Sequence, residues 1–275
     1  MTTATGPDER GFRAGPGRVR ARLGVRLCAA VLLAASPACR REPAPRSVEI
    51  LVPSLPASLD PYSDPRLVSR SIFSAIYEPL VAENDVGVRP ALAESWTNPA
   101  PDTWLFRIAP DATFHDRSPV TSREVVAAAH ASRTARGSVA SLADLRAIEV
   151  ADARTVRFRT FQAPEEFLLS VSALFITRRD ADRFVGSGAY RVVAHTPDRI
   201  VLARHDRPSR PAPWLDEVVF RRFGSTAEGL RLMRRGVPVA VADPSAAMVG
   251  EARNDPRLRV VTTDAGSLTY LAIGF

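Results

Sequence analysis

Residues 104–126 read WLFRIAPDATFHDRSPVTSREVV, and this stretch contains the most definite local structure in the sequence. Its opening WLFRI places large apolar residues beside an arginine, which predicts a strand with one wet face. Further along, Thr121 and Glu124 fit the S/T-x-x-E capping box, in which each side chain bonds the other residue's backbone N–H. Val120 and Val125 occupy the hydrophobic-staple positions around that start. The stretch therefore predicts a strand, a polar turn and a helix that begins after Thr121.

The turn inside this stretch places His115 beside Asp116, the residue types of a general base and its orienting carboxylate. Adjacent residues are poorly placed for that geometry, and no activated serine or cysteine accompanies them. A hydrolase that uses His115 is one alternative, but motifs without structural context are mostly false positives, so we predict no catalytic residue. The remaining histidines, His130, His195 and His205, are scattered without metal-ligand spacing, so we predict neither a metal site nor a cofactor.

The rest of the chain alternates between strand and helix patterns, as in a mixed α/β protein. The prolines of PSLPASLDPYSDP (53–65) predict a loop. In the helical segment 66–80, Leu67, Ile72, Ile76 and Leu80 are expected to form the buried face. Strands are predicted at VEILV (48–52), TVRFRT (155–160), RIVLAR (199–204), EVVFRRF (217–223), RVVTT (259–263) and SLTYLAIGF (267–275), and further helices at EEFLLSVSAL (165–174) and AEGLRLMRRG (227–236).

The composition is that of a folded protein, with 45% hydrophobic and 24% charged residues in a chain of 275, enough for a sizeable core. The formal net charge of +7 arises largely in residues 1–38, which hold six arginines and two acidic residues. The rest of the chain carries 31 arginines and 28 acidic residues. This near balance gives no reason to expect a nucleic-acid partner.

The N-terminus has the three-part layout of a secretory signal. An arginine-bearing stretch precedes the apolar run LCAAVLLAA (27–35), and small residues follow up to Cys39. The run is far shorter than the ~20 residues that a membrane-spanning helix needs. We therefore expect residues 1–38 to be a signal peptide and the mature protein to be exported, to the periplasm or the cell surface.

Cys39 stands at the expected cleavage point. ASPAC (35–39) resembles the lipobox of bacterial lipoproteins, which predicts that Cys39 is lipidated and that residues 39–46 form a tether. Ser36 stands where that motif usually has leucine, so ordinary cleavage after Ala38 is the alternative. A lipid anchor would make the membrane a partner of this protein.

Eight segments of the chain occur in an order that resembles the family 5 extracellular solute-binding proteins, the peptide- and nickel-type binding proteins of ABC importers. The block FHDRSPVTSREVV (114–126) is similar to the Phe-His-Asp-Gly-Thr-Pro-Leu-Thr-Ala-Glu-Asp-Val pattern of that family. The resemblance runs from about Val48 to the end of the chain. The other segments are LDPY (59–62), IYEPL (76–80), RPALAESW (89–96), GSGAYRV (186–192), RIVLAR (199–204), PWLDEVVFRRF (213–223) and LTYLAIGF (268–275), together with the WLFRIAPDAT that precedes the block.

The resemblance implies an α/β fold of the periplasmic-binding-protein type II, in which two lobes close over a ligand. This sequence corresponds to the first lobe only, with the second lobe missing. Because the chain also stops on an apolar strand, we expect a truncated or fragmentary product. By the same resemblance, residues 47–82 and 183–275 form the core of the lobe, and residues 83–182 form an inserted subdomain.

The sequence departs from the family pattern in four places. Arg117 replaces the usual glycine of the turn, so we expect either that Asp116 takes the positive-φ position or that the turn differs. Ala189 replaces a proline, and the chain is shorter than usual between His130 and Ser141 and again before Phe184. The shortening removes part of the inserted subdomain, which shapes one wall of the cleft in peptide-binding relatives. The resemblance therefore does not fix a peptide specificity.

The resemblance places the loop Tyr62–Leu67 at the ligand cleft, where an extended peptide can be held by backbone hydrogen bonds as an added strand. Ser63, Asp64 and Arg66 are the predicted ligand-binding residues. The acidic residue that holds a peptide's amino terminus in the family belongs to the missing lobe. Five aromatic residues are expected to pack in the core rather than to form a binding platform: Tyr77, Trp96, Trp104, Tyr190 and Tyr270.

These observations predict a non-enzymatic solute-binding component of an ABC importer. It would capture oligopeptides or a related small solute outside the cytoplasmic membrane and pass them to the permease subunits. A single lobe is expected to bind weakly, because ligand affinity in this fold depends on contacts from both lobes. The alternative is a single-lobe, lipid-anchored interaction or sensory protein without a role in transport.

Overall fold

The computed structural model describes residues 46–84, 87–135, 142, 144–161, 166–206, 212–236, 238–262 and 269–272. The chain divides into two units, Met1–Pro43 and Ala44–Phe275, and all of these residues belong to the second. The predicted signal peptide, Cys39 and most of the predicted tether lie outside the described residues. None of the described helices combines the length and the apolar character needed to cross a membrane.

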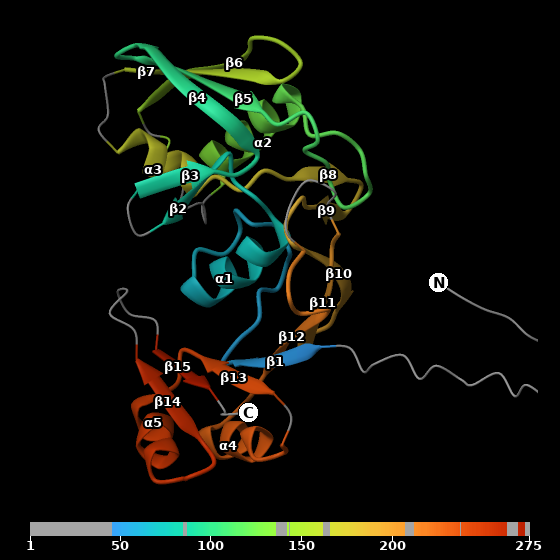
Figure 1. The fold of residues 1–275 in the computed structure, drawn as a ribbon, viewed down its shortest axis with the longest axis vertical. Helices are drawn as coiled ribbons and strands as arrows, with labels where there is room; N and C mark the ends of the chain where they lie inside the picture. Colours follow the sequence, from blue (N-terminus) through green and yellow to red (C-terminus); the bar gives the residue numbers. More distant parts are fainter. Residues whose placement is uncertain are drawn as a thin grey trace, which may run out of the picture. The chain divides into compact units, whose positions relative to one another are not determined.

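A seven-stranded mixed sheet is the largest sheet in the described part of this unit (Figure 1). Its central strand is β1 (Ser47–Val52), which pairs in parallel with β12 (Glu217–Arg222) on one side and with β13 (Val239–Ala242) on the other. The outer strands pair antiparallel, and the order is β10-β11-β12-β1-β13-β15-β14. These outer strands are β10 (Tyr190–His195), β11 (Arg199–Arg204), β14 (Arg259–Thr262) and β15 (Thr269–Ala272).

Helices cover both faces of this sheet, because its central strands carry apolar side chains on both sides. Leu51 packs with Leu230 and other residues of α4 and α5 on one face. The next residue, Val52, packs with Ile72 of α1 on the other face, as the alternation of side chains along a strand requires. The helices are α1 (Leu67–Ile76), α4 (Thr226–Met233) and α5 (Ala246–Arg253).

A four-stranded antiparallel sheet is built from the intervening part of the chain, with the order β4-β5-β7-β6. Phe106 and Phe158 on neighbouring strands have ring centroids 5.3 Å apart, and Phe158 and Phe167 are 5.6 Å apart, both edge to face. Aromatic packing of this kind adds to the burial energy of the core. The elements are β4 (Ala93–Ala100), β5 (Thr103–Ile108), α2 (Ser122–Thr134), β6 (Leu145–Val150), β7 (Thr155–Thr160) and α3 (Phe167–Ser172), with the small pairs β2 (Val81–Asn84) and β3 (Gly87–Pro90), and β8 (Arg178–Asp180) and β9 (Arg183–Val185).

Helix α2 begins where its sequence predicted. Thr121 is the N-cap, and both hydrogen bonds of the capping box with Glu124 are present. The Thr121 N–H donates to Glu124 Oε2 at 2.9 Å, and Val120 and Val125 are buried in one apolar cluster. The predicted sequence of strand, turn and capped helix is therefore confirmed.

In the turn before α2, Arg117 is the residue that takes the positive φ. Phe114 N–H donates to Ser118 O at 2.9 Å, and Arg117 N–H donates to Phe114 O at 2.8 Å. This pattern is a three-residue hairpin connection, whose last loop residue takes a left-handed conformation. Arg117 has that conformation, with φ 70°, so the first of the two alternatives, a positive φ at Asp116, is wrong. The Asp116 carboxylate instead accepts the Ser118 N–H at 3.0 Å, which holds Asp116 in the turn.

Helix α1 differs from its apolar pattern at its first residue. Ile72 and Ile76 are fully buried as expected, but the Leu67 side chain is 60% exposed, and Leu80 lies beyond the end of the helix. At 3.6 residues per turn, Leu67 lies roughly 140° around the helix from Ile72 and so points away from the buried face. The prediction that Leu67 belongs to the buried face is therefore wrong.

Candidate ligand-binding site

The carboxyl ends of three parallel strands meet at one edge of the seven-stranded sheet. The register places Val52 beside Arg222 and Leu51 beside Val241, so β1, β12 and β13 leave the sheet at the same edge. In open α/β sheets, ligands bind outside the carboxyl ends of the strands. The loop 53–66, which contains the predicted ligand-binding residues, starts from this edge.

Two of the predicted residues, Asp64 and Arg66, bind each other. Arg66 Nε donates to Asp64 Oδ1 at 2.9 Å, and the guanidinium also reaches the Ser54 hydroxyl and, at 3.3 Å, the Leu55 carbonyl. The Ser69 hydroxyl donates to Asp64 at 2.8 Å. The hydrogen bond from Arg66 has the largest effect on the Asp64 carboxyl, and together with the bond from Ser69 it lowers the pKa of Asp64 to about 2. The pair therefore joins both ends of the loop to the first turn of α1.

Ser63 and Leu67, on either side of this pair, are exposed. The Ser63 hydroxyl donates to Asp60 O at 2.8 Å. In the described part of the chain, the α1 N-cap residue Arg66 makes no side-chain capping bond, so the first N–H groups of α1 are left for solvent or ligand. An exposed leucine beside free backbone donors offers both an apolar and a polar contact.

Two buried tyrosines fix the base of the loop. The Tyr77 hydroxyl donates to Leu59 O at 2.6 Å, and the Tyr62 hydroxyl donates to Phe175 O. Burial raises the pKa of both phenols, so they act only as neutral donors. The expectation that Tyr77 packs in the core is confirmed, since it is 1% exposed.

The other aromatic residues with a predicted core role also pack against neighbours where the structure describes them. Trp96 stacks on Phe106 with centroids 6.5 Å apart, and Trp104 lies 5.4 Å from Phe167. Tyr190 is partly buried in the cluster under α1. The Tyr270 side chain lies outside the described residues.

His115 and Asp116 each hold the turn to another part of the fold. His115 Nε2 lies 3.1 Å from Gly188 O, whereas Asp116 bonds Ser118 and Arg178. The Ser118 hydroxyl, together with the Arg178 guanidinium, lowers the pKa of Asp116 to about 2. Among the described residues, no three His, Cys, Asp or Glu side chains are placed to hold a metal ion.

A sheet of this strand order, with helices on both faces and an inserted antiparallel sheet, defines one lobe of a type II periplasmic binding protein. The chain belongs to the bacterial extracellular solute-binding proteins of family 5: residues 87–275 match "Bacterial extracellular solute-binding proteins, family 5 Middle". No curated protein matches the chain.

Solved structures of such binding proteins are similar to this chain in fold. MoaA of A. tumefaciens R10, in complex with mannopinic acid, aligns with a TM-score of 0.72 and 23% identity, over 80% of this chain and 50% of its own. DppA of Helicobacter pylori, in complex with the peptide STSA, gives 0.69 and 20% over 78% and 50%. NikA of Staphylococcus aureus, with Ni(L-His)2, gives 0.66 and 19% over 78% and 47%. The chain thus spans about half the length of these structures.

Proposed function

We propose that this chain is the solute-binding component of an ABC importer and that it captures an oligopeptide or a related amino-acid-derived solute. The observation that carries the proposal is the meeting of three parallel strand ends beside an anchored loop with an exposed tip. The ligands named for the similar structures, mannopinic acid, a peptide and histidine-bound nickel, all carry a carboxylate. A carboxylate suits the N-terminus of α1, beside the Arg66 guanidinium that also holds Asp64.

In this proposal the protein binds and releases its ligand without changing it. The backbone of residues 62–67 pairs with the extended ligand, and Leu67 provides an apolar contact. Asp64 and Arg66 are proposed ligand-binding residues whose mutual ion pair also keeps the loop in one conformation, which reduces the entropy lost on binding. Ser63 adds an exposed hydroxyl at the same place.

The described residues provide one wall of the proposed cleft, and we propose that a second lobe provides the other, because type II binding proteins clamp a ligand between two lobes. Within this lobe we keep the division into a core of residues 47–82 and 183–275 and an inserted subdomain of residues 83–182. Export, lipidation of Cys39 and delivery to a permease belong to the same proposal. Mass spectrometry of the mature N-terminus would test the lipid on Cys39.

A titration followed by amide NMR tests the binding site. Tripeptides such as Ala-Ala-Ala should shift the amide signals of residues 62–69 with an affinity on the order of millimolar, since this lobe provides only one wall of the cleft. Arg66→Ala should weaken this binding, whereas Arg259→Ala, at an exposed arginine on β14, should not. Shifts that avoid residues 62–69 would contradict the proposed site.

A further inference from the structure

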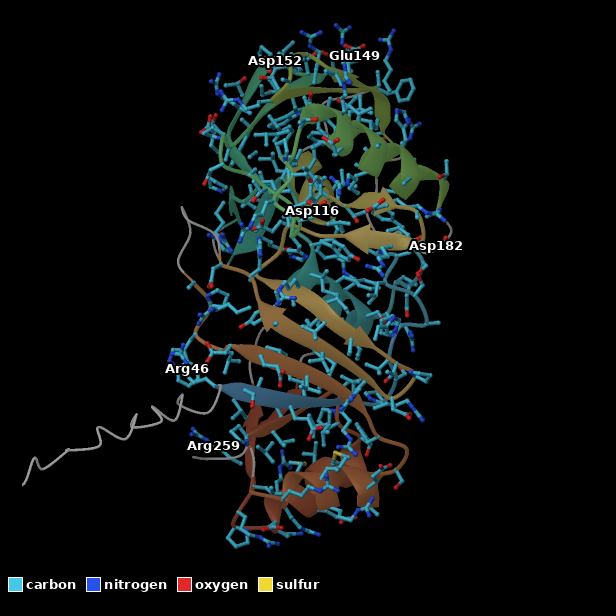
Figure 2. The ribbon with its side chains drawn as sticks, turned by 90° about the vertical axis from the view of Figure 1, so that its right-hand side faces the viewer. Arg46, Asp116, Glu149, Asp152, Asp182 and Arg259 are labelled. Atoms are coloured by element: carbon cyan, nitrogen blue, oxygen red, sulfur yellow. The ribbon has the colours of Figure 1, made fainter. Side chains whose placement is uncertain are left out.

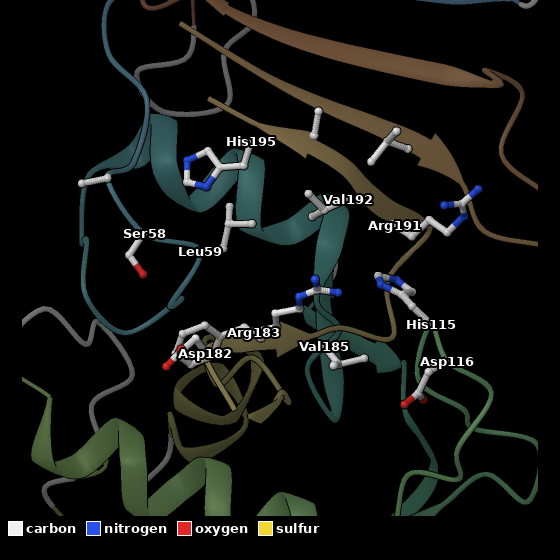
Figure 3. Close-up of a pocket in the computed structure, with 14 residues that line it drawn as sticks. Ser58, Leu59, His115, Asp116, Asp182, Arg183, Val185, Arg191, Val192 and His195 are labelled. Atoms are coloured by element: carbon white, nitrogen blue, oxygen red, sulfur yellow. The ribbon is translucent and has the colours of Figure 1, made fainter. Parts of the chain in front are cut away.

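A pocket of about 700 Å³ lies between the edges of two strands and does not include Ser63, Asp64, Arg66 or Leu67 (Figure 3). One side is formed by residues 191–195 of β10, and the facing side by residues 182–185 of β9 and its turn. Residues 57–59 and 115–116 border the other two sides. Asp116 and Asp182 lie on the same face of the molecule (Figure 2). We call this pocket the β9–β10 slot.

The slot exposes strand edges rather than the face of a sheet. Successive side chains of a strand point to opposite faces, so a pocket on one face would touch every second residue. The slot instead touches five consecutive residues on one side and four on the other. β10 is the outermost strand of its sheet, and β9 belongs to a two-stranded sheet with β8, so each has one edge without a strand partner among the described residues. Edge strands present unpaired N–H and C=O groups to an incoming strand.

The β10 edge offers an apolar contact as well as backbone groups. The register passes from Val192 opposite Leu202 to Ala194 opposite Val201, so a bulge leaves Val193 unpaired. The Val193 side chain is 55% exposed. Five residues of extended chain span about 16 Å, the length of a short peptide.

The charges around the slot favour an acidic occupant. Arg183 and Arg191 both line it and form no ion pair with any residue in the described part of the chain. Of the two carboxylates in the lining, Asp116 is already bound by Arg178, and Asp182 alone offsets the two arginines. An acidic side chain in the slot would therefore gain a charged partner.

The connection between the two strands of the slot packs closely against α1. The connection from β9 to β10 contains Gly186 and Gly188, and the Gly188 N–H donates to Ile76 O at 2.8 Å. A Cβ on Gly186 would lie 2.0 Å from the same oxygen, so this connection is pressed against the end of α1. A recess bordered on all four sides accepts a single extended strand, whereas the sheet edge of a second copy would meet the bordering residues 57–59.

We propose that the β9–β10 slot binds a short extended peptide with an acidic side chain by strand addition to β10. This site shares residues 57–59 of the loop 53–66 but includes none of Ser63, Asp64, Arg66 and Leu67, and it goes beyond the function proposed above.

The test uses two pentapeptides with blocked ends, Ala-Val-Glu-Val-Ala and Ala-Val-Lys-Val-Ala, added to the full chain and followed by amide NMR. The Glu peptide should shift the signals of residues 182–185 and 191–195 and bind about tenfold more tightly than the Lys peptide. Two further peptides carry N-methyl groups, one on the odd-numbered and one on the even-numbered backbone nitrogens. One of the two should lose binding and the other should keep it, because only every second N–H faces the strand.

Arg191→Glu should reverse the preference between the two peptides, and the same charge change at Arg259, on β14 and outside the lining, should leave it intact. Equal affinity of the Glu and Lys peptides, or equal binding of the two N-methylated peptides, would overturn the proposal. Neither of these measurements needs a variant of the protein. Shifts confined to residues 62–69 would overturn it while supporting the carboxyl-edge site, so the two proposals can fail separately.

Discussion

Replacing Arg117 with glycine should stabilise the protein. A left-handed conformation costs a residue with a Cβ about 1–2 kcal/mol, and Arg117 holds φ 70°. Glycine removes that strain but is freer in the unfolded chain, which offsets roughly 0.5–1 kcal/mol. The Arg117 side chain is exposed and forms no ion pair among the described residues, so little else is lost. The expected net gain is about 0.5–1 kcal/mol.

Urea unfolding followed by circular dichroism measures this gain. The midpoint should rise while the slope stays unchanged, and the melting temperature should rise by roughly 1–4 °C. Arg117→Ala is the matched control, because it removes the same guanidinium but keeps the Cβ and its strain. If the Gly variant is no more stable than the Ala variant, the left-handed strain at this position is refuted.

Gly186→Ala should destabilise by about 2–3 kcal/mol through overpacking, whereas Gly250→Ala, inside α5 with open space around it, should stabilise by about 1 kcal/mol; equal urea midpoints would contradict both. Thr121→Ala should cost about 1 kcal/mol through the lost cap, and an unchanged melting curve would count against it. Asp64 has a pKa of about 2 in the folded state and ~3.9 unfolded, so its ion pair stabilises the fold above about pH 4 and is lost toward pH 2. The stability difference between wild type and Asp64→Asn should therefore shrink over that range, and a constant difference would refute the ion pair's role.

The elements that the sequence predicted best are those specified by near neighbours in the chain. The capping box of Thr121 and Glu124 involves residues three apart, so its geometry follows from the pattern alone. Leu67 was assigned to the buried face by a spacing that was only roughly helical; nine residues before Ile76, it lies on the opposite side of α1 and is exposed. The mutual bonding of Asp64 and Arg66 was also not predicted, although both were singled out.

Contacts across long chain separations were beyond prediction from the sequence. Asp116 meets Arg178 from 62 residues away, and His115 lies against His205, with ring centroids 4.9 Å apart. The β9–β10 slot likewise assembles four segments that no local pattern connects. Spacing and periodicity describe single elements, and nothing in them reports which strand edge will face another.

The position of β1 at the centre of the sheet sets when the protein can fold. Its neighbours come late in the chain: Glu49 meets Arg221 from 172 residues away. At a synthesis rate of about 5–20 residues per second, the first strand waits roughly 10–30 s for its partner. Loop closure over such a distance also slows folding once the chain is complete. The seven-stranded sheet therefore cannot be completed until its late strands β12 to β15 have been synthesised, whereas the four-stranded sheet, built from residues 93–160, has no such delay.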